Sequence, residues 1–219
     1  MDAISPWKPG ELLHEGAEAT VTAGSWLGVP AVLKVRRPRG YRHPDLDRRL
    51  TRQRLAAEAR VLSRLQAIGF PSPEIMHLDQ KDALILMSRV DGVPLHDLLK
   101  DGSAGRGVLE GLGALIRRLH ESGISHGDLT THNVMASGEG DLSLIDFGLS
   151  RQSPELEHLG LDLQVLNECL GASHSSIEDA IGAVCDGYLK ADSGDSRSES
   201  ATNVVERFRK ITSRVRYHG

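Results

Sequence analysis

Two short polar motifs near the middle of the chain contain the residue types that phosphoryl transfer requires. The first runs from His126 to Asn133 and matches the pattern H-x-D-L-x-x-x-N, with Asp128 five residues before Asn133. The second, Asp146-Phe147-Gly148, begins thirteen residues beyond Asn133. Phosphoryl transfer needs a carboxylate near the attacking hydroxyl or water, and oxygen ligands for the Mg²⁺ that bridges the phosphates. We therefore predict that Asp128 orients the nucleophile and that Asn133 and Asp146 bind Mg²⁺.

A lysine and a glutamate earlier in the chain fit the same chemistry. Lys34 follows an apolar run, and Glu58 lies three residues after Leu55 and four before Leu62, on the apolar face of a predicted helix. A carboxylate on that face needs a partner. Protein kinases use such a pair to hold a lysine amine on the phosphates of ATP. Taken alone, the two residues also fit a snorkelling lysine and a glutamate at the edge of the stripe, just as each polar motif alone also fits a turn.

The elements expected to hold these residues form two lobes. In residues 1–90, apolar alternation and turn residues predict antiparallel strands and a single long helix. The predicted strands lie within 12–23, on either side of Gly16, and over 31–35, 74–79 and 83–87, with a turn over 24–30 and the helix over 47–68. This lobe is an α+β unit with one helix on a small sheet.

Residues 91–219 are predicted to be mainly helical. The helices cover 108–119, 159–170, 177–189 and 203–216, a strand covers 142–145, and the serine-rich tract 192–200 is predicted to be a mobile connector. The expected fold class is therefore α+β and bilobal, with an antiparallel-sheet N-lobe and a reduced, mainly helical C-lobe.

The segment from His14 to Ala19 is a weak candidate for a phosphate-covering loop. It holds the single glycine Gly16 where the usual kinase loop has three, so its backbone approaches phosphates less freely. Without the other motifs this segment would be interpreted as a hairpin turn.

Taken together, these residues resemble the family of small kinases of the KEOPS assembly, which acts in threonylcarbamoyl-adenosine modification of tRNA. The resemblance spans about residues 16 to 163. It is carried by Gly16 to Ala19, Lys34, Tyr41 to Asp47, Glu58 to Arg60, His126 to Thr131, Asp146 to Ser150, and Asp162-Leu163. The segment Tyr41-Arg42-His43-Pro44 discriminates best, because general kinase families lack it.

The resemblance implies a minimal protein-kinase-like fold and a serine/threonine kinase with ATPase activity that uses ATP and Mg²⁺. It implies catalytic roles for Asp128, Lys34 and Glu58 and metal binding by Asn133 and Asp146. The implied nucleotide-binding residues are Gly16, Ala17, Glu18, Ala19, Lys34 and Met87. The implied partners are the tRNA threonylcarbamoyl-transferase catalytic subunit and the other KEOPS subunits.

Four features depart from the patterns of related kinases. Gly127 replaces an arginine that reads activation-loop phosphate in many protein kinases, and no Ala-Pro-Glu segment follows Asp146. Ser88-Arg89 stands where acidic residues are expected, and the tail reads Arg214-Val215-Arg216-Tyr217. Regulation by loop phosphorylation is therefore not expected.

Charge is unevenly distributed along the chain. The net charge is −4, from 26 basic and 30 acidic residues. Residues 34–64 carry eleven Lys/Arg and three acids, and residues 204–219 carry five and one. Such basic segments suit tRNA phosphates, although solvated helix faces have the same composition. The apolar runs are too short to span a membrane, and no secretory signal is evident, so a cytoplasmic protein is expected.

Two other functions also fit the motifs. A small-molecule kinase resembling aminoglycoside phosphotransferases shares the His-Gly-Asp motif and a downstream aspartate, although such enzymes generally carry a helical insertion. A nucleotide-holding scaffold without turnover would share the binding residues. ATP hydrolysis separates the scaffold from an enzyme.

Overall fold

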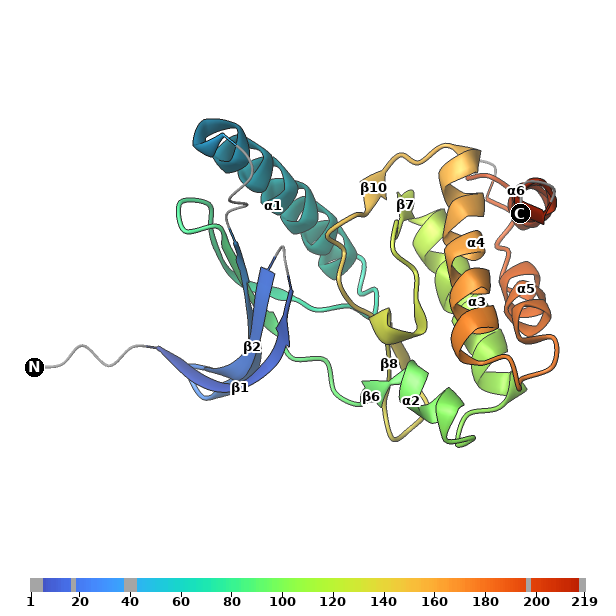
Figure 1. Cartoon of the computed structure of the whole chain (residues 1–219), viewed down its shortest axis with the longest axis horizontal. Helices are drawn as coiled ribbons and strands as arrows, with labels where there is room; N and C mark the ends of the chain where they lie inside the picture. The colour runs from blue at the N-terminus through green and yellow to red at the C-terminus, as the bar shows by residue number, and fades with distance from the viewer. Residues whose placement is uncertain (1–5, 17–18, 38–42, 196–197, 217–219) are drawn as a thin grey trace, which may run out of the picture. The chain divides into compact units, whose positions relative to one another are not determined.

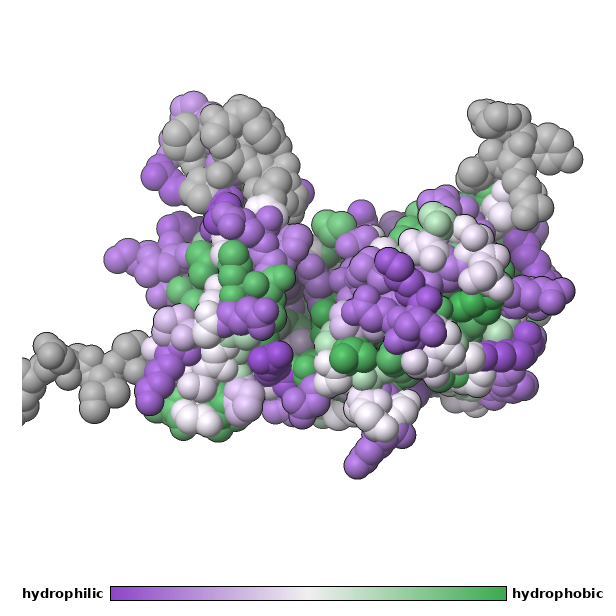
Figure 2. Space-filling model, turned by 60° about the horizontal axis from the view of Figure 1, so that its bottom comes forward, coloured by the Kyte–Doolittle hydropathy of each residue, from purple (hydrophilic) through white to green (hydrophobic). Residues whose placement is uncertain are grey.

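A computed structural model describes residues 6–16, 19–37, 43–195 and 198–216. The chain divides into two compact units, Met1–Val90 (unit 1) and Asp91–Gly219 (unit 2), shown in Figure 1. Hydrophilic residues cover most of the visible face of each unit, and small apolar patches lie among these hydrophilic residues (Figure 2). Within the part of the chain that the structure describes, no helix is long and apolar enough to cross a membrane.

Unit 1 is built on a five-stranded antiparallel sheet with the order β1-β2-β3-β5-β4. Its strands are β1 Trp7–Glu15, β2 Ala19–Trp26, β3 Val29–Arg36, β4 Ile75–Asp79 and β5 Leu84–Ser88. The sheet and the single helix of this unit confirm the predicted fold class of the N-lobe.

A turn lies within the predicted range 24–30 but is shorter than predicted, because β2 and β3 meet in a two-residue hairpin. Leu27 and Gly28 have φ values of 51° and 88°, and a tight hairpin needs positive φ at both central residues. Gly24, which suggested a turn, lies inside β2 beside Trp7. A Cβ at Gly24 would lie 2.3 Å from the carbonyl oxygen of Lys8, so the neighbouring strand requires a glycine there.

The long helix α1, Pro44–Ala67, begins three residues earlier than predicted. Proline is tolerated in the first turn of a helix, and the His43 side chain accepts a hydrogen bond from the Asp45 N–H. The buried face of α1 carries Leu55 and Ala59, which pack against Ile85 and Met87 of β5. This packing holds α1 on the face of the sheet that carries Lys34.

Unit 2 is mainly helical, as predicted. Its helices are α2 Leu95–Lys100, α3 Arg106–Glu121, α4 Leu156–Ser173, α5 Ala180–Lys190 and α6 Ala201–Arg216, with the 3₁₀ helix η1 Thr131–Asn133. Its strands are short: β6 Val93–Pro94, β7 Ile124–Ser125, β8 Val134–Ala136, β9 Leu142–Leu144 and β10 Arg151–Gln152. They form a β6-β8-β9 sheet and a β10-β7 pair.

Helices α3 and α5 approach each other closely through glycines. A Cβ at Gly113 would lie 2.0 Å from the Val184 carbonyl oxygen, and one at Gly187 would lie 1.9 Å from that of Glu110. Larger residues at these two positions would force the helices apart.

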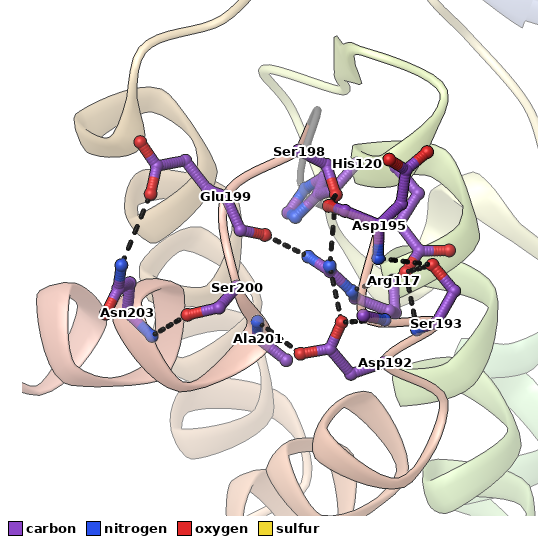
Figure 3. A network of polar contacts seen from close by, with 12 residues as sticks. Arg117, His120, Asp192, Ser193, Asp195, Ser198, Glu199, Ser200, Ala201 and Asn203 are labelled. Carbon is purple, nitrogen blue, oxygen red and sulfur yellow. Dashed lines mark hydrogen bonds and ion pairs between the residues drawn. The ribbon is translucent and has the colours of Figure 1, made fainter.

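The tract after α5 is anchored by a buried arginine, so the prediction of a mobile connector is wrong for its described residues (Figure 3). Arg117 of α3 is fully buried and donates to Asp192 Oδ1 at 2.7 Å and to the Glu199 carbonyl oxygen at 2.7 Å. Asp192 Oδ2 in turn accepts from the N–H of Ala201, the first residue of α6, at 2.8 Å. That hydrogen bond is the main cause of a lowered pKa at Asp192.

Replacing Arg117 with alanine should destabilise the protein by about 3–5 kcal/mol, because removal of one partner leaves the others of a buried ionic network uncompensated. Urea unfolding measures this difference. The neighbouring exposed Arg118→Ala is the matched control and should cost less than about 1 kcal/mol. Equal losses for the two variants would contradict an anchoring role for Arg117.

Candidate functional site

In unit 1 the structure brings Lys34 and Glu58 together. Lys34 Nζ on β3 lies 2.7 Å from Glu58 Oε1 on α1, and the exposed fractions of the two side chains are 10% and 1%. Glu58 lies between Leu55 and Ala59 of the buried helix face, which explains its burial.

Sequence reasoning missed a second cation on Glu58. The Arg36 guanidinium donates from Nη2 to Glu58 Oε2 at 2.5 Å. Arg36 is two residues from Lys34, and residues two apart on a strand point to the same face, so the alternation of β3 could have revealed it.

In unit 2 a network of hydrogen bonds places the two polar motifs side by side. Asn133 Nδ2 donates to the Asp128 carbonyl oxygen at 2.8 Å and to Asp128 Oδ2 at 3.2 Å. The Asn133 carbonyl oxygen accepts from the Ile145 N–H at 2.9 Å, next to the pairing of β8 with β9. Asp146 directly follows Ile145, so this hydrogen bond places Asp146 near Asn133.

Asp146 has a backbone conformation that few residues adopt. Its φ is 59°, in the left-handed region where aspartate and asparagine are among the better-tolerated residues. Its Oδ1 accepts from the Gly148 N–H at 3.2 Å, and the next residue, Phe147, is buried against the His126 ring at a centroid distance of 5.0 Å. Backbone strain of this kind is often found at functional sites.

A buried carboxylate, Asp162, is hydrogen-bonded to the backbone of the loop just before Asp128. Asp162 of α4 accepts from the His126 N–H at 2.6 Å and from the Gly127 N–H at 2.8 Å. Burial alone would raise the pKa of Asp162, but the contact with His120 and these donors hold the pKa below its usual value. Asp162 was noted in the sequence only as part of the resemblance; its position under the loop comes from the fold.

The His126 ring is neutral and has a defined tautomer. Its Nδ1 accepts from the Asp128 N–H at 3.3 Å, so the proton lies on Nε2, which donates to the Ile145 carbonyl oxygen at 3.0 Å. Burial lowers the pKa of His126. The ring thereby links the Asp128 loop to the segment that leads into Asp146.

Gly127 can hold no side chain in this loop. Its φ is 81°, and a Cβ there would lie 2.3 Å from the Leu149 carbonyl oxygen. The absence of an arginine before Asp128 is therefore dictated by close contact with the segment after Asp146.

The predicted nucleotide-binding residues lie in unit 1. Gly16 and Ala19 flank the first hairpin, where the Gly16 N–H donates to the Ala19 carbonyl oxygen at 3.0 Å. Ala17 and Glu18 lie outside the described residues. Met87 is 8% exposed and belongs to the buried cluster formed with Leu55 and Ala59.

The oxygen atoms that the two motifs offer fit Mg²⁺. Because Asn133 Nδ2 donates to Asp128, the amide keeps Oδ1 as the atom able to ligate a cation, and Asp146 supplies carboxylate oxygen. Among the described residues, no group of three or more His, Cys, Asp or Glu side chains could hold a metal ion. Mg²⁺ usually binds to one or two protein oxygens together with substrate phosphates, so this donor set suits a metal that arrives with a nucleotide.

A histidine cluster surrounds Thr131, three residues after Asp128. The buried hydroxyl of Thr131 lies 3.1 Å from His174 Nε2 and 3.4 Å from His96 Nδ1, and the His96 ring stacks on His132 at 3.9 Å. Burial first, and then the neighbouring histidines, lower the pKa of His96 and of His174 from 6.5.

These pKa shifts predict that stability falls in mild acid. Because the unfolded chain binds protons at His96 and His174 more readily than the folded protein, their contribution is fully present above about pH 6.5 and is lost as the pH falls below it. The melting temperature should therefore decrease between about pH 7.5 and pH 5.5. The double variant His96→Gln/His174→Gln should show a shallower decrease, whereas the exposed His14→Gln should match the wild type. Equal slopes in all three proteins would contradict this prediction.

Comparisons with known proteins show kinase families and kinase folds. The lipopolysaccharide kinase (Kdo/WaaP) family matches residues 34–164. A Rio2 kinase from Chaetomium thermophilum, solved as an ADP/Mg²⁺-phosphoaspartate complex, aligns with a TM-score of 0.58 and 19% identity, covering 94% of this chain and 71% of that one. This likeness confirms the protein-kinase-like fold.

Two groups of relatives share more of the sequence. A probable bifunctional tRNA threonylcarbamoyladenosine biosynthesis protein of Methanothermobacter thermautotrophicus is 36% identical over 95% of this chain, but the match spans 37% of that protein. The EKC/KEOPS complex subunit bud32 of Aspergillus clavatus is 35% identical over 86% of this chain and 85% of its own length. The predicted resemblance is thereby confirmed, and the chain belongs to the Bud32 family of kinase-like KEOPS subunits.

Proposed function

We propose that this protein is the ATP-dependent serine/threonine kinase and ATPase subunit of a cytoplasmic KEOPS complex that supports threonylcarbamoyl-adenosine modification of tRNA. The observation that carries the proposal is the arrangement of Asp128, Asn133 and Asp146 in unit 2, where Asn133 is hydrogen-bonded to Asp128 and to Ile145, the residue before Asp146. The kinase-like fold and the names of the relatives support it.

Each residue has a role that its surroundings support. Lys34, held by Glu58, would bind the α- and β-phosphates of ATP, and Gly16 to Ala19 and Met87 would line the rest of the nucleotide site. Asn133 and Asp146 would hold Mg²⁺. When bound, this ion would neutralise negative charge that develops on the phosphates.

Asp128 would accept a hydrogen bond from the attacking group. Its carboxylate is held by Asn133 Nδ2, and its backbone N–H is held by His126 Nδ1. A serine or threonine hydroxyl gives kinase activity at such a site, and water gives ATP hydrolysis. The same residues therefore serve both reactions.

The experiment that tests this function follows the radiolabelled γ-phosphate of ATP. The protein is assayed alone, with the KEOPS catalytic subunit, and with that subunit and tRNA. Mg²⁺-dependent release or transfer to protein hydroxyls, stimulated by the partners and lost in Lys34→Met, supports the proposal. The control is Arg37→Met, whose exposed side chain contacts Glu15. Nucleotide binding without turnover would indicate a scaffold, and transfer only to aminoglycosides would indicate a small-molecule kinase.

We further propose that tRNA binds through exposed basic residues of α6. Arg209, Lys210 and Arg214 are exposed, whereas Arg207 forms an ion pair with Glu157 of α4. Arg36 of the other basic segment is buried on Glu58, and Arg39 and Arg42 lie outside the described residues.

The triple variant Arg209→Gln/Lys210→Gln/Arg214→Gln should weaken tRNA binding and reduce its salt dependence, since cations that bind phosphates release counterions. The slope of log affinity against log salt should fall by about one for each phosphate that the variant no longer neutralises. Binding is measured across a salt series. Lys81→Gln/Lys100→Gln, two exposed lysines outside the basic helix, is the control. An unchanged slope in the triple variant would remove α6 as a tRNA-binding element.

A further inference from the structure

Glu58 is held by two cations, one on each carboxylate oxygen. Lys34 Nζ binds Oε1 at 2.7 Å and Arg36 Nη2 binds Oε2 at 2.5 Å. We propose that Arg36 is a positioning residue for nucleotide binding, which acts by holding Glu58 in place while the Lys34 amine turns to the phosphates. This inference rests on the proposed function and adds a residue to it.

The backbone of Arg36 is held on both sides by neighbouring segments, so the start of its side chain has a fixed position. The Arg36 N–H donates to the Ala83 carbonyl oxygen at 3.0 Å, and Arg36 pairs with Ala19 across the sheet. Its side chain is 6% exposed and reaches the same face of β3 as Lys34. The guanidinium therefore reaches Glu58 from a backbone position that is hydrogen-bonded within the sheet.

Stabilisation alone is a poor explanation for this arginine. Its Nε is buried with no hydrogen-bond partner among the described residues. A buried guanidinium that leaves an N–H unsatisfied costs free energy, and apolar side chains that replace a whole buried ion pair are often at least as stabilising as the pair. The feature that such a side chain would not reproduce is the bond to Glu58 Oε2.

That bond matters when a phosphate competes for the lysine. A lysine ammonium has three donors, and a phosphate draws them away from the carboxylate beside it. If Lys34 were the sole support of Glu58, the carboxylate would lose its orientation as the phosphate bound. Arg36 keeps one oxygen of Glu58 bonded throughout, so the other oxygen stays aimed at Lys34.

The test is a double-mutant cycle measured as kcat/KM for MgATP at a temperature where every variant is folded. Arg36→Met should lower kcat/KM about tenfold, and Arg36→Lys should recover to within about threefold of the wild type. In a Glu58→Gln background, Arg36→Met should change kcat/KM less than about twofold, because the residue acts through Glu58. Arg37→Met, whose exposed side chain binds Glu15 instead, is the control.

Losses that simply add in the two backgrounds, or an Arg36→Met variant equal to wild type, would overturn the inference while leaving the proposed function intact. A wild-type protein that neither binds nor hydrolyses MgATP would overturn both. If Arg36→Met melts below the assay temperature, Arg36→Leu, which also lacks a donor, takes its place in the same cycle and is interpreted in the same way.

Discussion

The Asp146→Asn variant should lose Mg²⁺-dependent ATP turnover by about a thousandfold, which corresponds to about 4 kcal/mol of transition-state stabilisation. The asparagine amide lacks the negative charge of the carboxylate that we propose binds Mg²⁺. The fold should survive, because asparagine tolerates the left-handed backbone conformation at φ 59° and can still accept from the Gly148 N–H.

Steady-state turnover with saturating MgATP, together with a thermal melt, measures both parts of this prediction. Asp141→Asn is the matched control, since Asp141 is exposed and lies just before β9. Turnover within about twofold of wild type in a folded Asp146→Asn protein would remove the phosphotransferase assignment.

Asp128→Asn should lower kcat by about a hundredfold or more while KM for MgATP changes little, because Asp128 is assigned to the nucleophile and not to the phosphates. The loop should keep its shape, since Asn133 Nδ2 also donates to the Asp128 carbonyl oxygen and the Asp128 N–H still reaches His126 Nδ1.

The separation of kcat from KM distinguishes the two aspartates. At low Mg²⁺, Asp146→Asn should show weaker nucleotide binding and Asp128→Asn should not. A large rise in KM with unchanged kcat in Asp128→Asn would instead place that carboxylate on the nucleotide.

The long elements of this fold could be predicted from periodicity, and the short ones could not. The spacing of Leu55 and Leu62 indicates α1 and places Glu58 on its buried face, where the structure has it. Strands of two or three residues, such as β7 and β8, carry too few positions for any period to be read. The tight turn at Leu27 depends on backbone conformation, which a leucine does not signal.

The limits at the site have a similar origin. Spacing was enough to associate Asp128, Asn133 and Asp146, because one strand pair connects them. Asp162 supports the loop from a helix far along the chain, so its contact depends on tertiary packing. The tract around Asp192 shows the converse limit. A segment rich in serine and aspartate has the same composition whether it is solvated or anchored by a buried arginine, so composition alone predicts mobility there and misses the anchor.

The contact between Gly127 and the Leu149 carbonyl oxygen also limits how this protein can evolve. Every amino acid other than glycine places a Cβ within 2.3 Å of that oxygen. An arginine at position 127 would therefore require the segment after Asp146 to be rebuilt at the same time. Recognition of activation-loop phosphate through this position would thus need at least two simultaneous changes. A single substitution of Gly127 would give a loop that clashes with the segment after Asp146.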